Sequence, residues 1–298
     1  MVARGGNRTM SGTGPRGDHY HRLPRRLIVH LIDGTYELFR HFYGLRRFNK
    51  GVDAPLGGVL GVLRTVVQML EGGATHLGVA TDHVVESFRN DIWPGYKTGE
   101  GLEPALWRQF HPLEDALSAM GVQVWAMKEL EADDGLASAA ALSARDPRVE
   151  KVCIWTPDKD LAQCVVGERV VQVDRKSGRI TDEAAVRAKF GVPPSLIPDF
   201  LALVGDAADG YPGLPGIGKQ TAARLLERFG PLETWPPSQL EGDRRELALV
   251  FKVLAKLRDD APLFESVDEL EWKGATPAFQ GWAERCGDLR LIERLARV

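Results

Sequence analysis

Carboxylates are the residues in this sequence best suited to do chemistry, and they occur in short clusters. The segment 129–142 carries Glu129, Glu131, Asp133 and Asp134 ahead of an alanine-rich run that predicts a helix. Acids in a first helical turn oppose the helix dipole, but two would be enough for that. Glu131 and Asp134 are three residues apart and share a helix face, where like charges repel one another. Water or a cation must compensate this repulsion.

Further acids follow predicted strands. Short apolar runs at 27–32, 75–81, 122–127 and 151–156 alternate with helical stretches. This alternation indicates an α/β fold with a mainly parallel sheet flanked by helices. Ligands bind beyond the carboxyl ends of the strands in such sheets. One edge of the sheet is therefore expected to collect seven acids, namely Asp33, Asp82, Glu131, Asp133, Asp134, Asp158 and Asp160.

The number of these acids indicates a metal centre. A single Asp after a strand is usually a helix cap or a turn residue. Seven carboxylates together raise one another's pKa values and destabilise the fold unless cations neutralise them. Oxygen ligands without His or Cys select hard ions, so we expect Mg²⁺ or Mn²⁺, and two ions rather than one. Two such ions are a common device for phosphodiester hydrolysis.

A glycine-rich loop at 205–218, between two helical stretches, is the second informative segment. It matches the GxxxxGK spacing of NTP-binding loops, but Gln220 replaces the Ser or Thr that holds Mg²⁺ and no strand precedes it. We expect instead that the second helix exposes backbone N–H groups to a DNA phosphate, independent of sequence. A turn that is merely tight is the alternative. The expected DNA contacts are Gly216, Gly218, Lys219, Gln220 and Thr221.

Composition sets bounds on location and partners. The 298 residues are 44% hydrophobic, and no apolar run reaches the length of a membrane span. Three widely spaced cysteines fit a reducing cytoplasm. Residues 1–26 hold six Arg and one acid and are expected to form a disordered tail, which leaves 32 basic and 40 acidic residues, a net charge of −8. This charge disfavours a nucleic-acid partner unless metals neutralise the clustered acids.

Five segments of the sequence resemble one known family. They read LIDGTYELFRHF, ATDHVVESFR, ELEADD, TPDKDLAQCV and FGVPPSLIPDFLALVGDAADGYPGLPGIGKQTAARLL. In this order they resemble the bacterial 5′ nucleases, which include the 5′–3′ exonuclease domain of DNA polymerase I, stand-alone exonucleases and flap endonucleases. The resemblance runs from about residue 27 to near the C-terminus.

The resemblance implies a domain plan and further ligands. Residues 27–190 would form a PIN-like catalytic domain, and residues 191–298 a helix–three-turn–helix DNA-binding region with C-terminal helices. Asp206 and Asp209 would join the metal set, and their turn would hold K⁺. With all nine acids neutralised, the net charge of the rest becomes +1. No polymerase segment follows, so we expect a free-standing monomer that works with a separate DNA polymerase.

The segment 87–110 corresponds to the family's helical arch. The resemblance implies that Arg89 and Lys97 are catalytic cations that stabilise charge on the scissile phosphate. Tyr96 would stack on an unpaired base. The residues after Lys97 read TGEGLEP, so this arch is short and poorly basic, which leaves the preference for a flap open.

These features together predict a divalent-metal-dependent enzyme that hydrolyses DNA at 5′ ends or 5′ flaps and leaves 5′-phosphate and 3′-hydroxyl products. The first ion would be held by Asp33, Asp82, Glu131, Asp133 and Asp134, and the second by Asp158, Asp160, Asp206 and Asp209. A PIN-type ribonuclease is one alternative, but such domains usually lack the glycine loop. A non-catalytic DNA-binding module is another, but a pure binder gains nothing from acids that face phosphates.

Overall fold

A computed structural model describes residues 26–48 and 54–298, so residues 1–25 of the expected tail lie outside the described part. Its centre is a six-stranded sheet in the order β3-β2-β1-β4-β5-β6. All neighbouring strands are parallel except β5 and β6. The predicted α/β fold is therefore confirmed. The strands are β1 (Leu27–Asp33), β2 (His76–Asp82), β3 (Gln123–Met127), β4 (Val149–Trp155), β5 (Val170–Asp174) and β6 (Arg179–Thr181).

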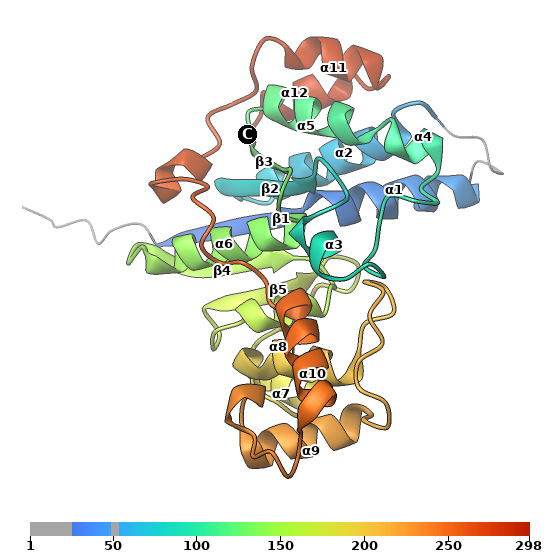
Figure 1. Cartoon of the computed structure of the whole chain (residues 1–298). Helices are drawn as coiled ribbons and strands as arrows, with labels where there is room; N and C mark the ends of the chain where they lie inside the picture. Colours follow the sequence, from blue (N-terminus) through green and yellow to red (C-terminus); the bar gives the residue numbers. More distant parts are fainter. Residues whose placement is uncertain (1–25, 49–53) are drawn as a thin grey trace, which may run out of the picture.

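Helices cover both faces of the sheet (Figure 1). They are α1 (Gly34–Phe48), α2 (Gly57–Glu71), α3 (Phe88–Ile92), α4 (Pro104–Trp107), α5 (Phe110–Ala119), α6 (Ala132–Arg145), α7 (Glu183–Phe190), α8 (Ile197–Val204), α9 (Lys219–Phe229), α10 (Gly242–Ala255), α11 (Phe279–Arg285) and α12 (Arg290–Leu295). In the described residues no helix is long and apolar enough to cross a membrane.

The alternation of buried side chains along β1 explains the layers. Ile32 packs with α2 and α5, whereas Val29 and Leu31 pack with α6 on the opposite face. Because side chains of a strand point alternately to the two faces, a strand covered on both faces is apolar along most of its length. The alanines of α6 let this helix approach the sheet closely.

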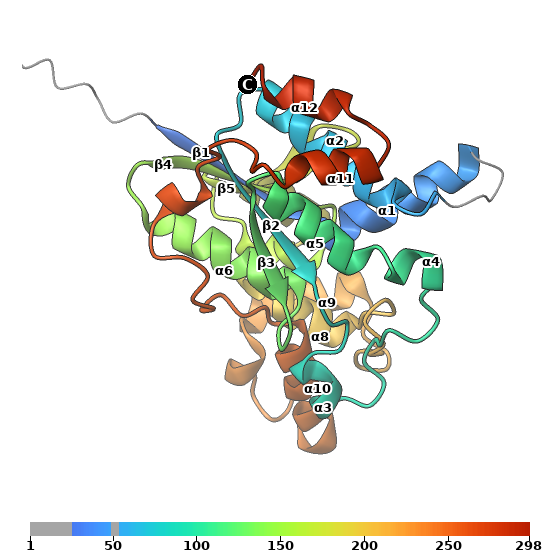
Figure 2. The same ribbon diagram turned by 90° about the horizontal axis from the view of Figure 1, so that it is seen from above.

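A smaller helical body holds α7 to α10 and has its own core around Phe200, Leu226 and Phe251. It lies beside the end of the sheet formed by β5 and β6 (Figure 1). The chain then crosses back. Phe279 of α11 and Leu291 of α12 belong to the core that α2 and α5 form. Figure 2 shows both helices next to α2 and α5.

The segment 87–110 is not a continuous helical arch. It consists of the short helices α3 and α4, joined by residues 93–103 without helix. Gly95 and Gly99 in this connection have low helix propensity. As the sequence indicated, the segment is short, but it lies against the glycine-rich turn at 205–213 instead of forming an open helical loop.

Candidate metal centre

The neighbouring strands β1 and β2 each end in an aspartate. Asp33 is the last residue of β1, and it accepts hydrogen bonds from the Tyr36 amide at 2.8 Å and from the Thr156 hydroxyl at 3.0 Å. Asp82 ends β2 and accepts from the Ala132 amide at 2.8 Å, which ties the strand to the start of α6. These bonds fix both carboxylates at the edge where the sequence analysis placed them.

Glu131 is the N-cap residue of α6 and is buried. One of its carboxylate oxygens accepts from the Ser87 hydroxyl at 2.7 Å. The other accepts from Lys97 Nζ at 2.8 Å and from the Tyr96 hydroxyl at 3.3 Å. Burial raises the pKa of Glu131, but Lys97 and Arg89 outweigh burial and lower it, so this carboxylate stays ionised.

Asp134 and Arg89 are engaged with each other. The Arg89 guanidinium donates to both Asp134 oxygens, at 2.7 and 2.8 Å, and to the backbone carbonyls of Leu254 and Lys256. The Asp134 oxygens also accept from the amides of Glu131 and Arg258. Every lone pair that a metal would need is thereby used, and the Arg89 side chain is 1% exposed.

Three expectations from the sequence do not fit this structure. Asp134 was expected to hold metal and Arg89 to contact the scissile phosphate, but the structure joins them in a buried ion pair that ties α3 to α6. Tyr96 was expected to stack on a base, yet its ring is buried in the core of the helical body. Long-range contacts that the sequence does not reveal decide all three placements.

Lys97 does lie at the acidic edge. Its ammonium contacts Glu131 at 2.8 Å and Asp209 at 2.9 Å. Burial lowers the pKa of Lys97, but Glu131 and Asp209 outweigh burial and raise it, so the ammonium stays charged. Two backbone-directed contacts dock the segment on the glycine-rich turn, since the Lys97 amide donates to the Asp209 carbonyl and Trp93 Nε1 donates to the Gly210 carbonyl.

Glycines shape the turn that carries Asp206 and Asp209. Gly205 and Gly213 both have positive φ and lie against each other, so a side chain at either would overlap backbone atoms. Gly210 also has positive φ, and a side chain there would overlap the Gly95 carbonyl. The sequence signature is therefore a packing requirement that brings this turn against the 93–97 segment.

Asp160, Asp206 and Asp209 each offer an oxygen within 4.8 Å of the other two, the one such group among the described residues. Asp160 Oδ1 is fully buried and has no hydrogen-bond partner in the described part of the chain. A buried carboxylate oxygen without a donor is costly unless a cation contacts it. The oxygen-only donor set fits a hard divalent ion. These three acids come from the segment after β4 and from the glycine-rich turn.

The remaining acids form an electrostatically coupled group beside this triad. Burial, together with Asp82 and Asp158, raises the pKa of Asp33 to about 7. Burial, Asp158 and Asp33 likewise raise the pKa of Asp133 well above its usual value. Carboxylates shift in this direction when like charges share a site. The structure thus brings Asp33, Asp82, Asp133, Asp158 and the triad to one edge.

Two lysines at this edge were missed from the sequence. Lys159 forms an ion pair with Asp206 and lies 3.9 Å from Asp160. It also lines a cavity of about 600 Å³ with Lys189 and Lys219. Burial, Arg179 and the other two lysines lower the pKa of Lys189, in keeping with the cavity that the three lysines share. The PDKD spacing after β4 was a usable signal for Lys159, whereas nothing near Lys189 in the sequence singles it out.

Two of the predicted DNA contacts line the same cavity as these lysines. Gly218 caps α9, and Lys219 and Gln220 line the cationic cavity. The space around Gly216 and Gly218 is open, so another molecule can approach the backbone there. The first N–H groups of a helix have no acceptor within it and attract anions.

A mainly parallel sheet with clustered carboxylates at its edge, next to a helix N-terminus and a cationic cavity, is the arrangement expected of a metal-dependent phosphodiester hydrolase. The comparisons specify the family. The profile for the 5′-3′ exonuclease N-terminal resolvase-like domain matches residues 28–191, and that for the 5′-3′ exonuclease C-terminal SAM fold matches residues 192–278. The chain belongs to the 5′–3′ exonuclease family, as its sequence motifs predicted.

Named relatives agree with this assignment. The 5′-3′ exonuclease of Aquifex aeolicus is 31% identical over 254 residues, which are 82% of this chain and 86% of the relative. DNA polymerase I of Bacillus caldotenax is 33% identical over 269 residues, 85% of this chain. This chain spans only 30% of the length of that polymerase.

A solved structure agrees in fold. A bacteriophage T5 flap endonuclease, in a complex with DNA and metal ions, superposes with a TM-score of 0.62 at 19% identity. The match covers 78% of this chain and 89% of that one. The predicted family is confirmed, and the findings support the 5′ nuclease interpretation over a PIN-type ribonuclease or a non-catalytic binding module.

Proposed function

We propose that this chain hydrolyses DNA phosphodiesters at 5′ ends or 5′ flaps and leaves 5′-phosphate and 3′-hydroxyl products. The observation that carries the proposal is the edge where the Asp160–Asp206–Asp209 triad adjoins the cationic cavity lined by Lys159, Lys189 and Lys219. A divalent-metal site and a phosphate-binding surface are both needed for this reaction, and here they share Asp206.

The geometry supports a division of the acids between two ions. One ion would lie at the triad with Asp158, and a second at Asp33, Asp82 and Asp133. Glu131 is left out of both sets, because its oxygens already accept from the Ser87 hydroxyl, Arg89, Lys97 and the Tyr96 hydroxyl. Such ions activate water and neutralise charge on the scissile phosphate when bound. Mg²⁺ fits this all-oxygen set, and Mn²⁺ is the alternative. We assign Asp134 to the Arg89 ion pair instead, because its oxygens are saturated with hydrogen bonds.

The chain's own cations have separate tasks. Lys97 reaches the acidic edge from a segment docked on the turn, so its ammonium is placed to contact a phosphate that enters the site. Gly216, Gly218, Lys219, Gln220 and Thr221, at the start of α9, would hold the backbone of one strand without reading bases. K⁺ in the turn at 205–211 would add a further phosphate contact.

Other expectations remain part of the proposal. The relatives that combine this region with a polymerase support a DNA polymerase as the functional partner, acting in trans on a monomeric nuclease. The free thiols of Cys153, Cys164 and Cys286 fit a reducing compartment, the cytoplasm.

The test uses a DNA duplex that carries a 5′ flap with a label at its 5′ end, incubated with EDTA, Mg²⁺ or Mn²⁺. We expect metal-dependent release of labelled product. A product of flap length indicates endonucleolytic cleavage, and mono- or dinucleotides indicate exonucleolytic cleavage. An RNA duplex of the same sequence is the matched control. Cleavage of RNA alone, or no cleavage with either metal, contradicts the proposal.

A further inference from the structure

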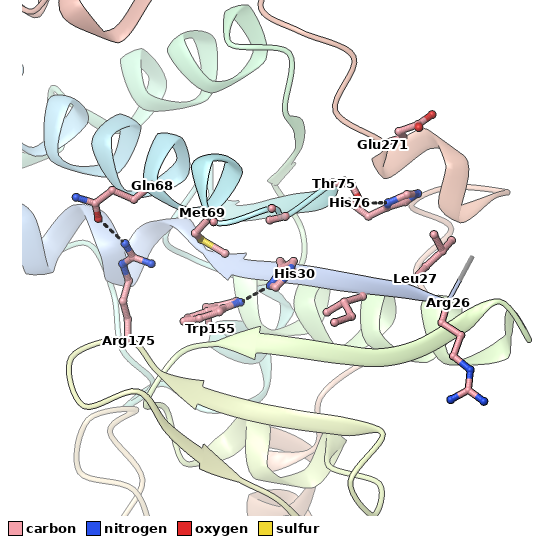
Figure 3. A pocket seen from close by; sticks show the side chains of 14 residues that line it. Arg26, Leu27, His30, Gln68, Met69, Thr75, His76, Trp155, Arg175 and Glu271 are labelled. Atoms are coloured by element: carbon pink, nitrogen blue, oxygen red, sulfur yellow. Dashed lines mark hydrogen bonds between the residues drawn. The ribbon is translucent and has the colours of Figure 1, made fainter. Parts of the chain in front are cut away.

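A second cavity, of about 660 Å³, lies on the sheet away from the acidic edge, and none of the nine predicted metal ligands lines it. Figure 3 shows it above β1 and β4, with the C-terminal end of α2 over it. Its volume falls within the range of about 300–1,000 Å³ that is usual for small-molecule sites. The 5′ nuclease reaction proposed above uses no residue of this cavity.

The floor of the cavity carries a fixed pair of rings. Trp155 Nε1 donates to His30 Nδ1 at 3.0 Å, and the two ring centroids are 5.9 Å apart. Because indole N–H can only donate, His30 Nδ1 carries no proton, and Nε2 of the neutral ring must carry it. No described residue accepts from His30 Nε2. The floor therefore offers a half-buried indole beside an unused N–H donor.

One end of the cavity carries a positive charge. Arg175 lies at the end near Trp155, with its guanidinium carbon 5.9 Å from the indole centroid and one N–H donated to Gln68 Oε1 at 2.9 Å. Among the described residues, no carboxylate forms an ion pair with Arg175. Glu37 attracts Arg175 electrostatically but is itself paired with Arg40. A half-buried guanidinium that forms no ion pair favours an anion, and its planar fork suits phosphate.

The opposite end of the cavity carries a negative charge. Glu271 lies there beside His76, with which it forms a backbone bridge, and Figure 3 shows this pair at the far side from Arg175. A phosphate near Glu271 would be repelled, so the two ends give a bound anion one direction. Arg26 also lines the cavity, but it is exposed and contacts Glu150.

We infer that this cavity binds a nucleoside monophosphate, with the base against Trp155 and His30 and the phosphate on Arg175. A flat ring, a donor for a base edge and a fork for phosphate lie in the same pocket, and no metal is needed to hold this ligand. The inference is independent of the nuclease reaction, because binding is expected without divalent ions.

The experiment titrates the full chain with deoxyadenosine 5′-monophosphate by calorimetry in EDTA, which removes metal-held phosphate binding. One equivalent is expected to bind. Arg175→Gln is expected to weaken binding by roughly tenfold or more, because a charge-assisted phosphate contact is lost. Lys176→Gln is the matched control, since it removes one charge from the adjacent exposed residue and leaves the cavity lining intact.

Three outcomes overturn the inference. The first is no binding at millimolar nucleotide, and the second is an equal effect of Arg175→Gln and Lys176→Gln. The third is binding of inorganic phosphate as tightly as the nucleotide, which would remove the base contact with Trp155. Flap cleavage in Mg²⁺, measured on the same Arg175→Gln protein, reports the nuclease separately, so failure of one proposal is not confused with failure of the other.

Discussion

Asp33→Asn measures how much the ionised carboxylate at the acidic edge destabilises the fold when no metal is bound. Asp33 is 6% exposed, and its pKa of about 7 lies above the usual value of 3.8. A pKa raised on folding means that stability is fully present below pH 4 and is lost as the pH rises through 7. At about 1.4 kcal/mol per pKa unit, the ionised side chain costs roughly 4 kcal/mol above pH 7.

Asparagine keeps the shape of this side chain and removes its charge. Its amide oxygen can still accept from the Tyr36 amide, and the Thr156 hydroxyl can turn to accept from the new NH₂ group. In EDTA at pH 8.5 we therefore expect Asp33→Asn to unfold at a higher urea concentration than the natural chain. Its free energy of unfolding should be larger by up to roughly 4 kcal/mol. The advantage shrinks toward pH 4, and saturating Mg²⁺ reverses it because the variant has lost a ligand.

Asp288→Asn is the matched control with the opposite sign. Hydrogen bonds from Arg290 and Arg64 lower the pKa of Asp288 to about 2, so its stabilising effect is present above pH 4 and lost as the pH falls through 2. Asp288→Asn is expected to reduce stability at pH 8.5, with or without Mg²⁺. If Asp33→Asn also proved less stable than the natural chain in EDTA at pH 8.5, the coupled-carboxylate interpretation would be refuted.

Four further variants test separate parts of the site. Lys97→Ala is expected to slow single-turnover cleavage by ~10²-fold with little change in DNA affinity; an unchanged rate removes it from the chemistry. Arg89→Met leaves Asp134 buried and unpaired, so urea titration should show a loss of about 3–5 kcal/mol; a stability like that of the natural chain contradicts the structural role. Lys189→Ala should reduce the slope of log DNA affinity against log salt concentration by an amount equal to about one phosphate contact. Anisotropy in EDTA measures this slope, and Arg187→Ala on the same helix should leave it unchanged. Tyr211 has a buried hydroxyl with no partner in the described chain, and Tyr211→Phe should weaken Mg²⁺ binding roughly tenfold without lowering stability in EDTA; equal Mg²⁺ affinity shows that this hydroxyl does not support the metal.

The sequence by itself determined where the acidic edge lies. Apolar runs of strand length alternate with helices, and parallel strands deliver whatever follows them to one edge. This is why Asp33, Asp82 and the acids near Glu131 and Asp158 could be placed together. The glycine-rich turn could also be predicted from the sequence, because positive φ and backbone contact exclude other residues at Gly205 and Gly213.

Only the tertiary structure decided which charged groups face the site. Arg89 pairs with Asp134, 45 residues away, and donates to the Leu254 carbonyl, 165 residues away. Tyr96 is buried by the helical body, and Lys189 joins Lys159 through a cavity between separate segments. Residue type and spacing specify local conformation and strand ends, whereas the partner of a charge depends on contacts between elements distant in sequence. The same reason hid the nucleotide-sized cavity, whose indole, imidazole and guanidinium come from β4, β1 and the turn after β5.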